Sequence, residues 1–266
     1  MIISLPWTNG NVTLPVFAAC VLFTAGMVIL TQAGLWLFHR WPGHVWLEQC
    51  NEIAGLVFGA ISIIYSLILA FVIVAVWDDY DNLNKSIQME TDKLNSILAH
   101  SSALPDSVRQ IVGKSVYNYC DQVIGQEWHM QKTHANHPSA IPVLRQALLT
   151  IQLETETQVR IFDVIDRDLS SISDQRRNRL SHTNSQMPNL IWYVLKTGTV
   201  LLILFAYFFR VPSLKLKHVY LGFLVIAISM CMFLVYTLDH PFDQQQGVSC
   251  EAYRTVQEES KAYLPH

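Results

Sequence analysis

Four long stretches with almost no charge constrain this chain more than any other feature. Residues 1–38, 53–77 and 218–238 contain no Asp, Glu, Lys or Arg. A fourth stretch, 190–209, has Lys196 as its single charge. At about 1.5 Å of rise per helical residue, each stretch is long enough to cross a hydrocarbon core of roughly 30 Å. Charged residues make up only 15% of the chain, whereas soluble domains carry about 25%. We therefore expect four transmembrane helices.

The first of these stretches is expected to be a permanent span rather than a removable signal. No basic segment precedes it, and the apolar run continues from Cys20 to Phe38. A secretory signal has a positively charged start and a shorter apolar core.

Composition and motif spacing argue against several other classes of protein. A net charge of −3 argues against nucleic-acid binding, which needs a basic face. The five cysteines show neither a disulfide framework nor zinc spacing. His129, His134 and His137 are close in sequence but lack carboxylate support, so we expect no metal site and no cofactor. Catalytic motifs are absent from the sequence, which argues against an enzyme.

The polar stretch at 78–189 shows helical rather than strand periodicity. Between residues 78 and 103, apolar side chains recur at helical spacing, namely Leu83, Ile87, Leu94, Ile97 and Leu98. Pro105 breaks the chain, and Asp106 is expected to cap a second helix at about 107–130. Residues 143–180 are expected to form one or two further helices. Their predicted buried positions are Leu144, Leu148, Ile151, Ile161, Ile165 and Leu169.

The expected fold is all-α, with four transmembrane helices in two pairs and a helical soluble domain inserted between spans two and three. The predicted parts are an N-terminal segment at 1–14, spans one and two within 15–77, the soluble domain at 78–189, spans three and four within 190–238, and a C-terminal tail at 239–266. Four spans place the soluble domain and both termini on one side of the membrane. Basic residues on the two sides nearly balance, so the positive-inside rule does not assign that side.

Span two carries a stripe of small residues on one helical face. Its members are Gly55, Gly59, Ser62, Ser66 and Ala70, at spacings of 4, 3, 4 and 4. A face of this kind suits close helix packing through the Gly-x-x-x-Gly pair. It equally suits the wall of a pore at the centre of an oligomer. The two interpretations overlap, because a pore helix also packs against its neighbours.

Span two ends at Trp77, an expected interfacial anchor, and three acids follow it. These acids are Asp78, Asp79 and Asp81. In one interpretation they form a solvated helix end, paired with the basic cluster Arg176, Arg177 and Arg179. In the other they form rings in an oligomer, which concentrate cations at a pore mouth. Asp239, at the end of span four on the same side, is a further candidate for this vestibule.

Lys196 lies inside span three, where an ammonium group is a functional candidate by default. Its long side chain can extend to the interface. The alternative is an ion pair with Asp239 or Asp78.

Several segments resemble the bestrophin-like domain family of uncharacterised four-span membrane proteins. The matching segments open span two at Asn51-Glu52-Ile53-Ala54-Gly55 and end it at 70–81. Further matches are Glu90, Glu127-Trp128, the Arg176-Arg177-x-Arg179-Leu180 cluster, Pro188, Trp192 and Leu238-Asp239-x-Pro241-Phe242.

The resemblance implies a distant kinship with bestrophins, which are pentameric channels with cytoplasmic helical domains and a pore lined by the second helix. It also implies a multi-pass protein of the cell membrane, with 78–189 and both termini in the cytoplasm. Bestrophins are mostly anion-conducting, whereas acids at a pore mouth would favour cations. No acidic run matches a calcium site.

Together these observations predict a homo-oligomeric ion channel, embedded in the lipid bilayer and conducting inorganic ions. The resemblance implies a pentamer. The alternative is a non-conducting membrane scaffold or sensor whose helical domain binds a partner, in which case the small-residue stripe serves packing alone.

Overall fold

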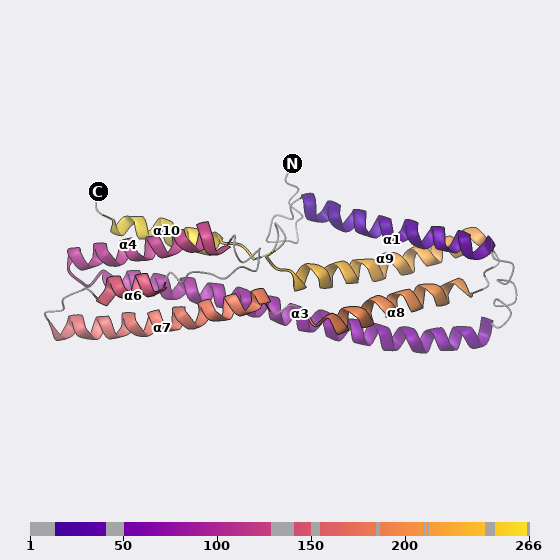
Figure 1. The fold of residues 1–266 in the computed structure, drawn as a ribbon, viewed down its shortest axis with the longest axis horizontal. Helices are drawn as coiled ribbons and strands as arrows, with labels where there is room; N and C mark the ends of the chain where they lie inside the picture. The colour runs from indigo at the N-terminus through magenta and orange to yellow at the C-terminus, as the bar shows by residue number, and fades with distance from the viewer. Residues whose placement is uncertain are drawn as a thin grey trace. The chain divides into compact units, whose positions relative to one another are not determined.

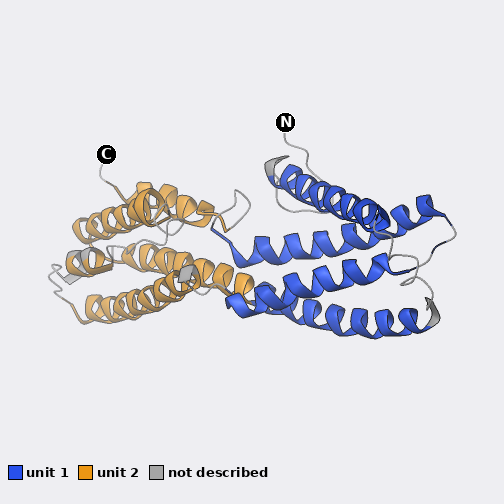
Figure 2. Ribbon diagram, turned by 45° about the vertical axis from the view of Figure 1, so that its right-hand side comes forward, with its two compact units in different colours: residues 1–78, 187–247 blue, residues 79–186, 248–266 orange. Residues whose placement is uncertain are grey.

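The computed structural model describes residues 14–40, 51–128, 141–149, 155–184, 187–209, 211, 213–242 and 248–264. Every regular element in these ranges is a helix (Figure 1). The chain forms two compact units (Figure 2). The membrane unit comprises residues 1–78 and 187–247, and the polar unit comprises residues 79–186 and 248–266. The long helix α3 (Asn51–Ser101) contributes its first part to the membrane unit and its second part to the polar unit.

The membrane unit contains α1 (Leu14–Arg40), the first part of α3, α8 (Asn189–Tyr207) and α9 (Leu214–Asp239). All four helices are long and apolar enough to cross a membrane, as the sequence predicted. Large apolar side chains remain on its surface, with Leu56 78% exposed and Phe223 69% exposed. Exposed apolar area on this scale is typical of a surface that faces lipid or another subunit.

Among the described residues, buried apolar side chains of the membrane unit gather in clusters that join its helices. The first consists of Tyr65, Leu69, Leu195, Leu202, Ile228 and Val235, from α3, α8 and α9. The second consists of Leu35, Tyr207, Leu221 and Val225, from α1, α8 and α9. The Tyr207 hydroxyl donates to the Thr31 carbonyl at 2.8 Å, which ties α8 to α1. A Cβ at Gly34 would lie 2.6 Å from that hydroxyl oxygen, so this approach requires a glycine.

In the part of the chain that the structure describes, the polar unit contains the second part of α3 and six further helical elements. These are α4 (Asp106–Gln122), the π-helix η1 (Val123–Glu127), α6 (Ile141–Leu149), α7 (Glu156–Asn184), α10 (Glu251–Ser260) and the 3-10 helix η2 (Lys261–Tyr263). The predicted apolar stripe of α3 is buried at all five positions, Leu83, Ile87, Leu94, Ile97 and Leu98. It forms the core of this unit with Val112 and Val116 of α4 and Ile165, Leu169 and Ile172 of α7.

Helix boundaries differ from the sequence predictions in two places. The N-cap of α4 is Pro105, not Asp106, and no side chain caps the helix. Asp106 is instead the first helical residue, where its carboxylate suits the positive end of the helix dipole, and it pairs with Arg109 at 2.9 Å. The predicted C-terminal tail contains α10, which packs against α4. Sequence periodicity did not reveal α10, because the helix is only ten residues long.

Three of the buried positions predicted for residues 143–180 are confirmed, namely Leu144, Ile165 and Leu169. Ile161 is half-buried. Leu148 and Ile151 lie outside the residues whose side chains the structure describes.

Candidate functional site

Tyr65 fixes the membrane part of α3 against α8. Its hydroxyl lies 2.7 Å from Thr199 Oγ1 and donates to the Leu195 carbonyl at 3.3 Å. The ring lies close to α8 at Gly198, where an added Cβ would be 2.5 Å from Tyr65 Cδ2. A tyrosine on one helix and a glycine on the other therefore set the distance between α3 and α8.

The small-residue stripe lies to one side of this packing face, by roughly a quarter of a helical turn. A Cβ added at Gly59 would meet nothing within 4 Å, and at Gly55 the nearest atom belongs to Phe209 at 3.9 Å. Ser66 and Ala70 are exposed. At Gly59, Ser66 and Ala70 the stripe is therefore not used for close packing between the described helices of this chain.

The two serines of the stripe differ in their hydrogen bonding. The Ser66 hydroxyl donates to the Ile63 carbonyl of its own helix at 2.9 Å. The Ser62 hydroxyl is buried and has no hydrogen-bond partner among the described residues. Buried hydroxyl groups are usually hydrogen-bonded, so a water molecule or another polar group is expected to bind the Ser62 hydroxyl.

The residues that end the apolar part of α3 are largely exposed. Trp77 is 56% exposed, as an interfacial anchor requires, and Asp78 and Asp79 are exposed as well. Asp81 pairs with Lys85 one turn later at 2.6 Å. An exposed pair of this kind contributes little to stability, about 0.3–0.5 kcal/mol.

The arginine cluster binds other acids than those after Trp77. Arg176 donates from Nε and Nη2 to Glu127, the shorter contact being 2.7 Å. Arg179 pairs with Glu90 and with Glu127, each at 3.1 Å. Arg177 is exposed and pairs with Asp174 on its own helix. The prediction that these arginines neutralise the acids after Trp77 is therefore wrong, because buried glutamates already occupy Arg176 and Arg179.

Glu90, Glu127, Arg176 and Arg179 form a buried ion network at the centre of the polar unit. The side chains of Glu90, Glu127 and Arg179 are fully buried. The Tyr119 hydroxyl donates to Glu90 Oε1 at 2.6 Å, and the Arg179 guanidinium lies 5.5 Å from the centroid of the Tyr253 ring. Two acids and two bases balance in charge, which is the condition under which buried charges are tolerated.

Local structure brings the members of the buried ion network together. Glu127 is the last residue of the π-helix η1, a rare widened turn. Glu90 stands in the apolar stripe of α3, between Ile87 and Leu94. Arg176 and Arg179 continue the apolar stripe of α7 at the same spacing as its buried residues. Charged residues at stripe positions are the sequence signal that reveals this network. Glu90, Glu127 and the two arginines were among the residues that resemble the family, but the sequence alone predicted no role for Glu90 and Glu127.

Burial and the ion network shift the pKa of several neighbouring groups. Burial and the charge of Glu90 raise the pKa of the Tyr119 hydroxyl well above its usual value. Burial also raises the pKa of the Cys120 thiol to about 12. Burial alone would lower the pKa of Arg179, but Glu90 and the surrounding tyrosines raise it well above its usual value. Arg179 is therefore a permanent cation, and Cys120 is an inert thiol in the folded unit.

Asp239 has a structural position at the end of α9. Its carboxylate accepts hydrogen bonds from the Met187 backbone N–H at 2.8 Å and from Trp192 Nε1 at 3.1 Å. Only 5% of the side chain is exposed. These bonds join the end of α9 to the start of α8. A role for Asp239 in a vestibule stays a prediction, and its two hydrogen bonds offer a different reason for its presence.

Lys196 forms no ion pair with Asp239 or with any other residue that the structure describes. Its Nζ lies 5.4 Å from the centroid of the Trp192 ring, in a cation–π contact on α8. The predicted pairing with Asp239 is wrong, because that carboxylate is engaged by Met187 and Trp192.

Lys93 and Ser96 on α3 both bind Asp168 on α7. Lys93 Nζ lies 2.9 Å from one carboxylate oxygen and Ser96 Oγ lies 2.6 Å from the other. Burial alone would raise the pKa of Asp168, but the hydrogen bonds from Ser96 and Lys93 outweigh it and lower the pKa. These contacts form a second polar link between α3 and α7.

Within the described ranges, no three His, Cys, Asp or Glu side chains gather as a metal site. His129, His134 and His137 lie outside those ranges.

The described residues include four helices long and apolar enough to cross a membrane, together with a polar unit of packed helices, as in a multi-pass helical membrane protein. A family model described as the Bestrophin-like domain matches residues 25–253. The chain belongs to this family, as the motifs in span two indicated. A comparison with curated proteins finds no match.

Solved structures of bacterial membrane proteins share this fold. Two variants of a bestrophin homolog from Klebsiella pneumoniae match with TM-scores of 0.61 and 0.63, at 12% and 13% sequence identity. The matches cover 93% and 91% of this chain and 98% and 99% of theirs. A structure described as a membrane protein matches with a TM-score of 0.65 at 12% identity, covering 92% of this chain and 99% of that one. At these identities the likeness establishes the fold.

Proposed function

We propose that this protein is a homo-oligomeric ion channel of the cell membrane in which the first part of α3 lines the pore. The pore wall is the small-residue stripe, Gly55, Gly59, Ser62, Ser66 and Ala70. The main support for this proposal is the surroundings of the stripe. A Cβ at Gly59 would have open space around it, and Ser66 and Ala70 are exposed. A membrane helix facing only lipid has no need of glycine and serine there. Membership of the bestrophin-like family supports a pentamer around a central axis.

The acids after Trp77 form the mouth of this pore and favour cations. Asp78 and Asp79 are exposed and no basic side chain of the described chain pairs with them. In a symmetric oligomer each carboxylate is repeated into a ring, which raises the local cation concentration and repels anions. Asp81 contributes less, because Lys85 compensates its charge.

The second candidate function is a non-conducting scaffold or sensor whose polar unit binds a partner. One observation favours it: the Ser66 hydroxyl already donates its hydrogen bond to the Ile63 carbonyl of its own helix. A stripe of small residues is what close packing against a neighbouring subunit requires.

A tryptophan at Ser66 separates the two functions. Ser66 is exposed, so Ser66→Trp meets no other part of the chain. In a channel, Ser66→Trp blocks ion flux in liposomes while the oligomer keeps its mass. In a scaffold, the same change breaks up the oligomer. Ile64→Trp is the matched control, because Ile64 is 61% exposed on a different face of the helix and is expected to leave both flux and assembly unchanged.

A further inference from the structure

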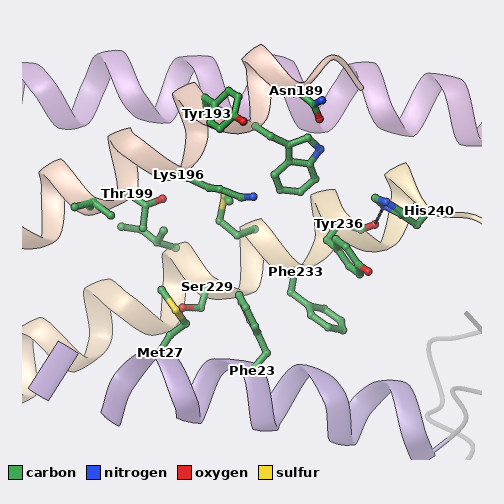
Figure 3. Close-up of a pocket in the computed structure, with 14 residues that line it drawn as sticks. Phe23, Met27, Asn189, Tyr193, Lys196, Thr199, Ser229, Phe233, Tyr236 and His240 are labelled. Atoms are coloured by element: carbon green, nitrogen blue, oxygen red, sulfur yellow. Dashed lines mark hydrogen bonds between the residues drawn. The ribbon is translucent and has the colours of Figure 1, made fainter. Parts of the chain in front are cut away.

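A cavity opens in the membrane unit between α1, α8 and α9. Its volume is about 650 Å³, within the usual range for ligand pockets. Apolar residues make up much of the lining and include Phe23, Met27, Val200 and Phe233, with the hydroxyl residues Thr199 and Ser229 among them. Polar and aromatic groups gather where α8 begins and α9 ends, at Asn189, Trp192, Tyr236 and His240 (Figure 3). The cavity is therefore amphipathic along its length.

Lys196 supplies the charge of this cavity. Figure 3 shows its side chain extending between α8 and α9 toward the end where Asn189 and His240 lie. No Asp or Glu is among the residues that line the cavity. Asp239 precedes the lining residue His240, but its carboxylate accepts hydrogen bonds from the Met187 backbone N–H and from Trp192 Nε1. An ammonium group thus faces an apolar chamber with no anion from the described chain.

We propose that this cavity binds one anionic phospholipid, with the phosphate on Lys196 and an acyl chain along Phe23, Met27 and Val200. Lys196 lies about two turns from the start of α8, and its long side chain reaches back toward the membrane interface, where phosphate groups lie. Basic pockets between transmembrane helices commonly hold acidic lipid headgroups. The Trp192 ring lies 5.4 Å from the ammonium nitrogen, and both residues line the cavity. This site rests on membrane embedding and not on ion conduction.

Native mass spectrometry of the purified full-length protein tests the lipid site. Phosphatidylglycerol is added in one series and phosphatidylcholine in the other. The unmodified chain is expected to retain phosphatidylglycerol preferentially. Lys196→Gln is expected to lower that preference roughly five-fold, the effect of one basic residue at a membrane surface. Lys215→Gln removes one charge at the other end of the membrane helices and is expected to change nothing.

A second variant tests the apolar part of the cavity without touching the charge. Val200 is 54% exposed, so Val200→Trp fills the cavity without entering the core. It is expected to abolish lipid retention although Lys196 remains. Equal retention of both lipids, or a preference that survives both Lys196→Gln and Val200→Trp, would overturn the proposal. A change of oligomeric mass in either variant would also overturn it, because the cavity would then be a subunit interface.

Discussion

The two parts of α3 hold their neighbours by different means. In the membrane part, one tyrosine and a set of apolar side chains contact α8 and α9, and the stripe beside them has open space at Gly59 and is exposed at Ser66 and Ala70. In the polar part, Glu90, Lys93 and Ser96 bind α7 through ion pairs and hydrogen bonds. In the polar unit, ion pairs and hydrogen bonds fix this continuous helix to α7. In the membrane unit, one face of the same helix has few contacts with the described helices of its own chain.

This difference follows from the solvent around each part. In lipid, water does not compete for hydrogen bonds, and apolar contact between helices gains little over contact with lipid, so close packing at small residues decides the geometry. In the polar unit a hydrophobic core forms, and buried charges are tolerated only as a balanced network. The unused stripe in the membrane part is what makes a pore the better-supported function.

The largest expected effect comes from breaking the buried ion network. Arg179→Gln leaves Glu90 and Glu127 buried with too little positive charge, at a cost of about 3–5 kcal/mol. The readout is alkylation of Cys120, whose burial raises its pKa to about 12 and keeps it unreactive in the folded unit. Opening of the polar unit is expected to speed alkylation by about 100-fold or more.

Arg177→Gln is the matched control on the same helix, because Arg177 is 77% exposed and pairs only with Asp174. We expect it to leave the alkylation rate unchanged. Equal rates for the two variants would contradict the role assigned to the network. Should Arg179→Gln fail to fold, Arg179→Lys keeps the charge, loses the bidentate geometry and is expected to give an intermediate rate.

A smaller effect is expected at Asp239, which joins α8 and α9. Asp239→Ala removes the acceptor for the Met187 N–H and for Trp192 Nε1, at a cost of about 1.5–3 kcal/mol. The thermal midpoint of the purified protein in detergent is expected to fall. Ion selectivity of Asp239→Asn, which keeps an oxygen acceptor, is expected to stay the same. A change in ion selectivity of Asp239→Asn with an unchanged thermal midpoint would contradict this expectation and support a role for Asp239 in the vestibule.

Two glycines on the membrane helices allow a packed face and an open face to be compared. Gly198 lies against Tyr65, whereas Gly59 has open space around it. Gly198→Ala places a Cβ about 2.5 Å from the Tyr65 ring and is expected to lower stability by about 1–3 kcal/mol. Gly59→Ala meets nothing within 4 Å and is expected to leave the fold of the subunit intact. Thermal unfolding of both variants makes the comparison. Equal loss of stability would mean that the stripe is covered within the chain.

The smallest expected effect is a pH dependence in the polar unit. Because Lys93 and Ser96 lower the pKa of Asp168, its contribution to stability is present above the unfolded value of about 3.9 and is lost as the pH falls through the folded value. Hydrogen exchange of α7 is expected to accelerate as the pH falls below the unfolded value of about 3.9, after correction for intrinsic rates. Asp168→Asn is expected to flatten that dependence, and an unchanged profile would remove Asp168 as its source.

Much of the architecture could be predicted from the sequence because the underlying signals are local. Uncharged stretches mark the four apolar helices, and the spacing of Leu83, Ile87 and Leu94 marks the buried face of α3. Contacts between segments far apart in the sequence could not be predicted from these local patterns. The partners of Arg176 and Arg179 depend on a π-helix whose location no pattern indicated, and the binding of Asp239 to Trp192 depends on how α8 meets α9. The stripe was visible in the sequence, but only the structure shows that the described helices leave it open at Gly59, Ser66 and Ala70.

The most direct test of the central claim is the reversal potential of purified protein in a planar bilayer under a KCl gradient. The account predicts a current that reverses near the potassium potential. It predicts that replacing Asp78, Asp79 and Asp81 with Asn shifts the reversal toward zero while the current persists. A reversal near the chloride potential, or one that the triple variant does not move, would contradict the acidic mouth. Folded, oligomeric protein that carries no current would contradict the pore itself.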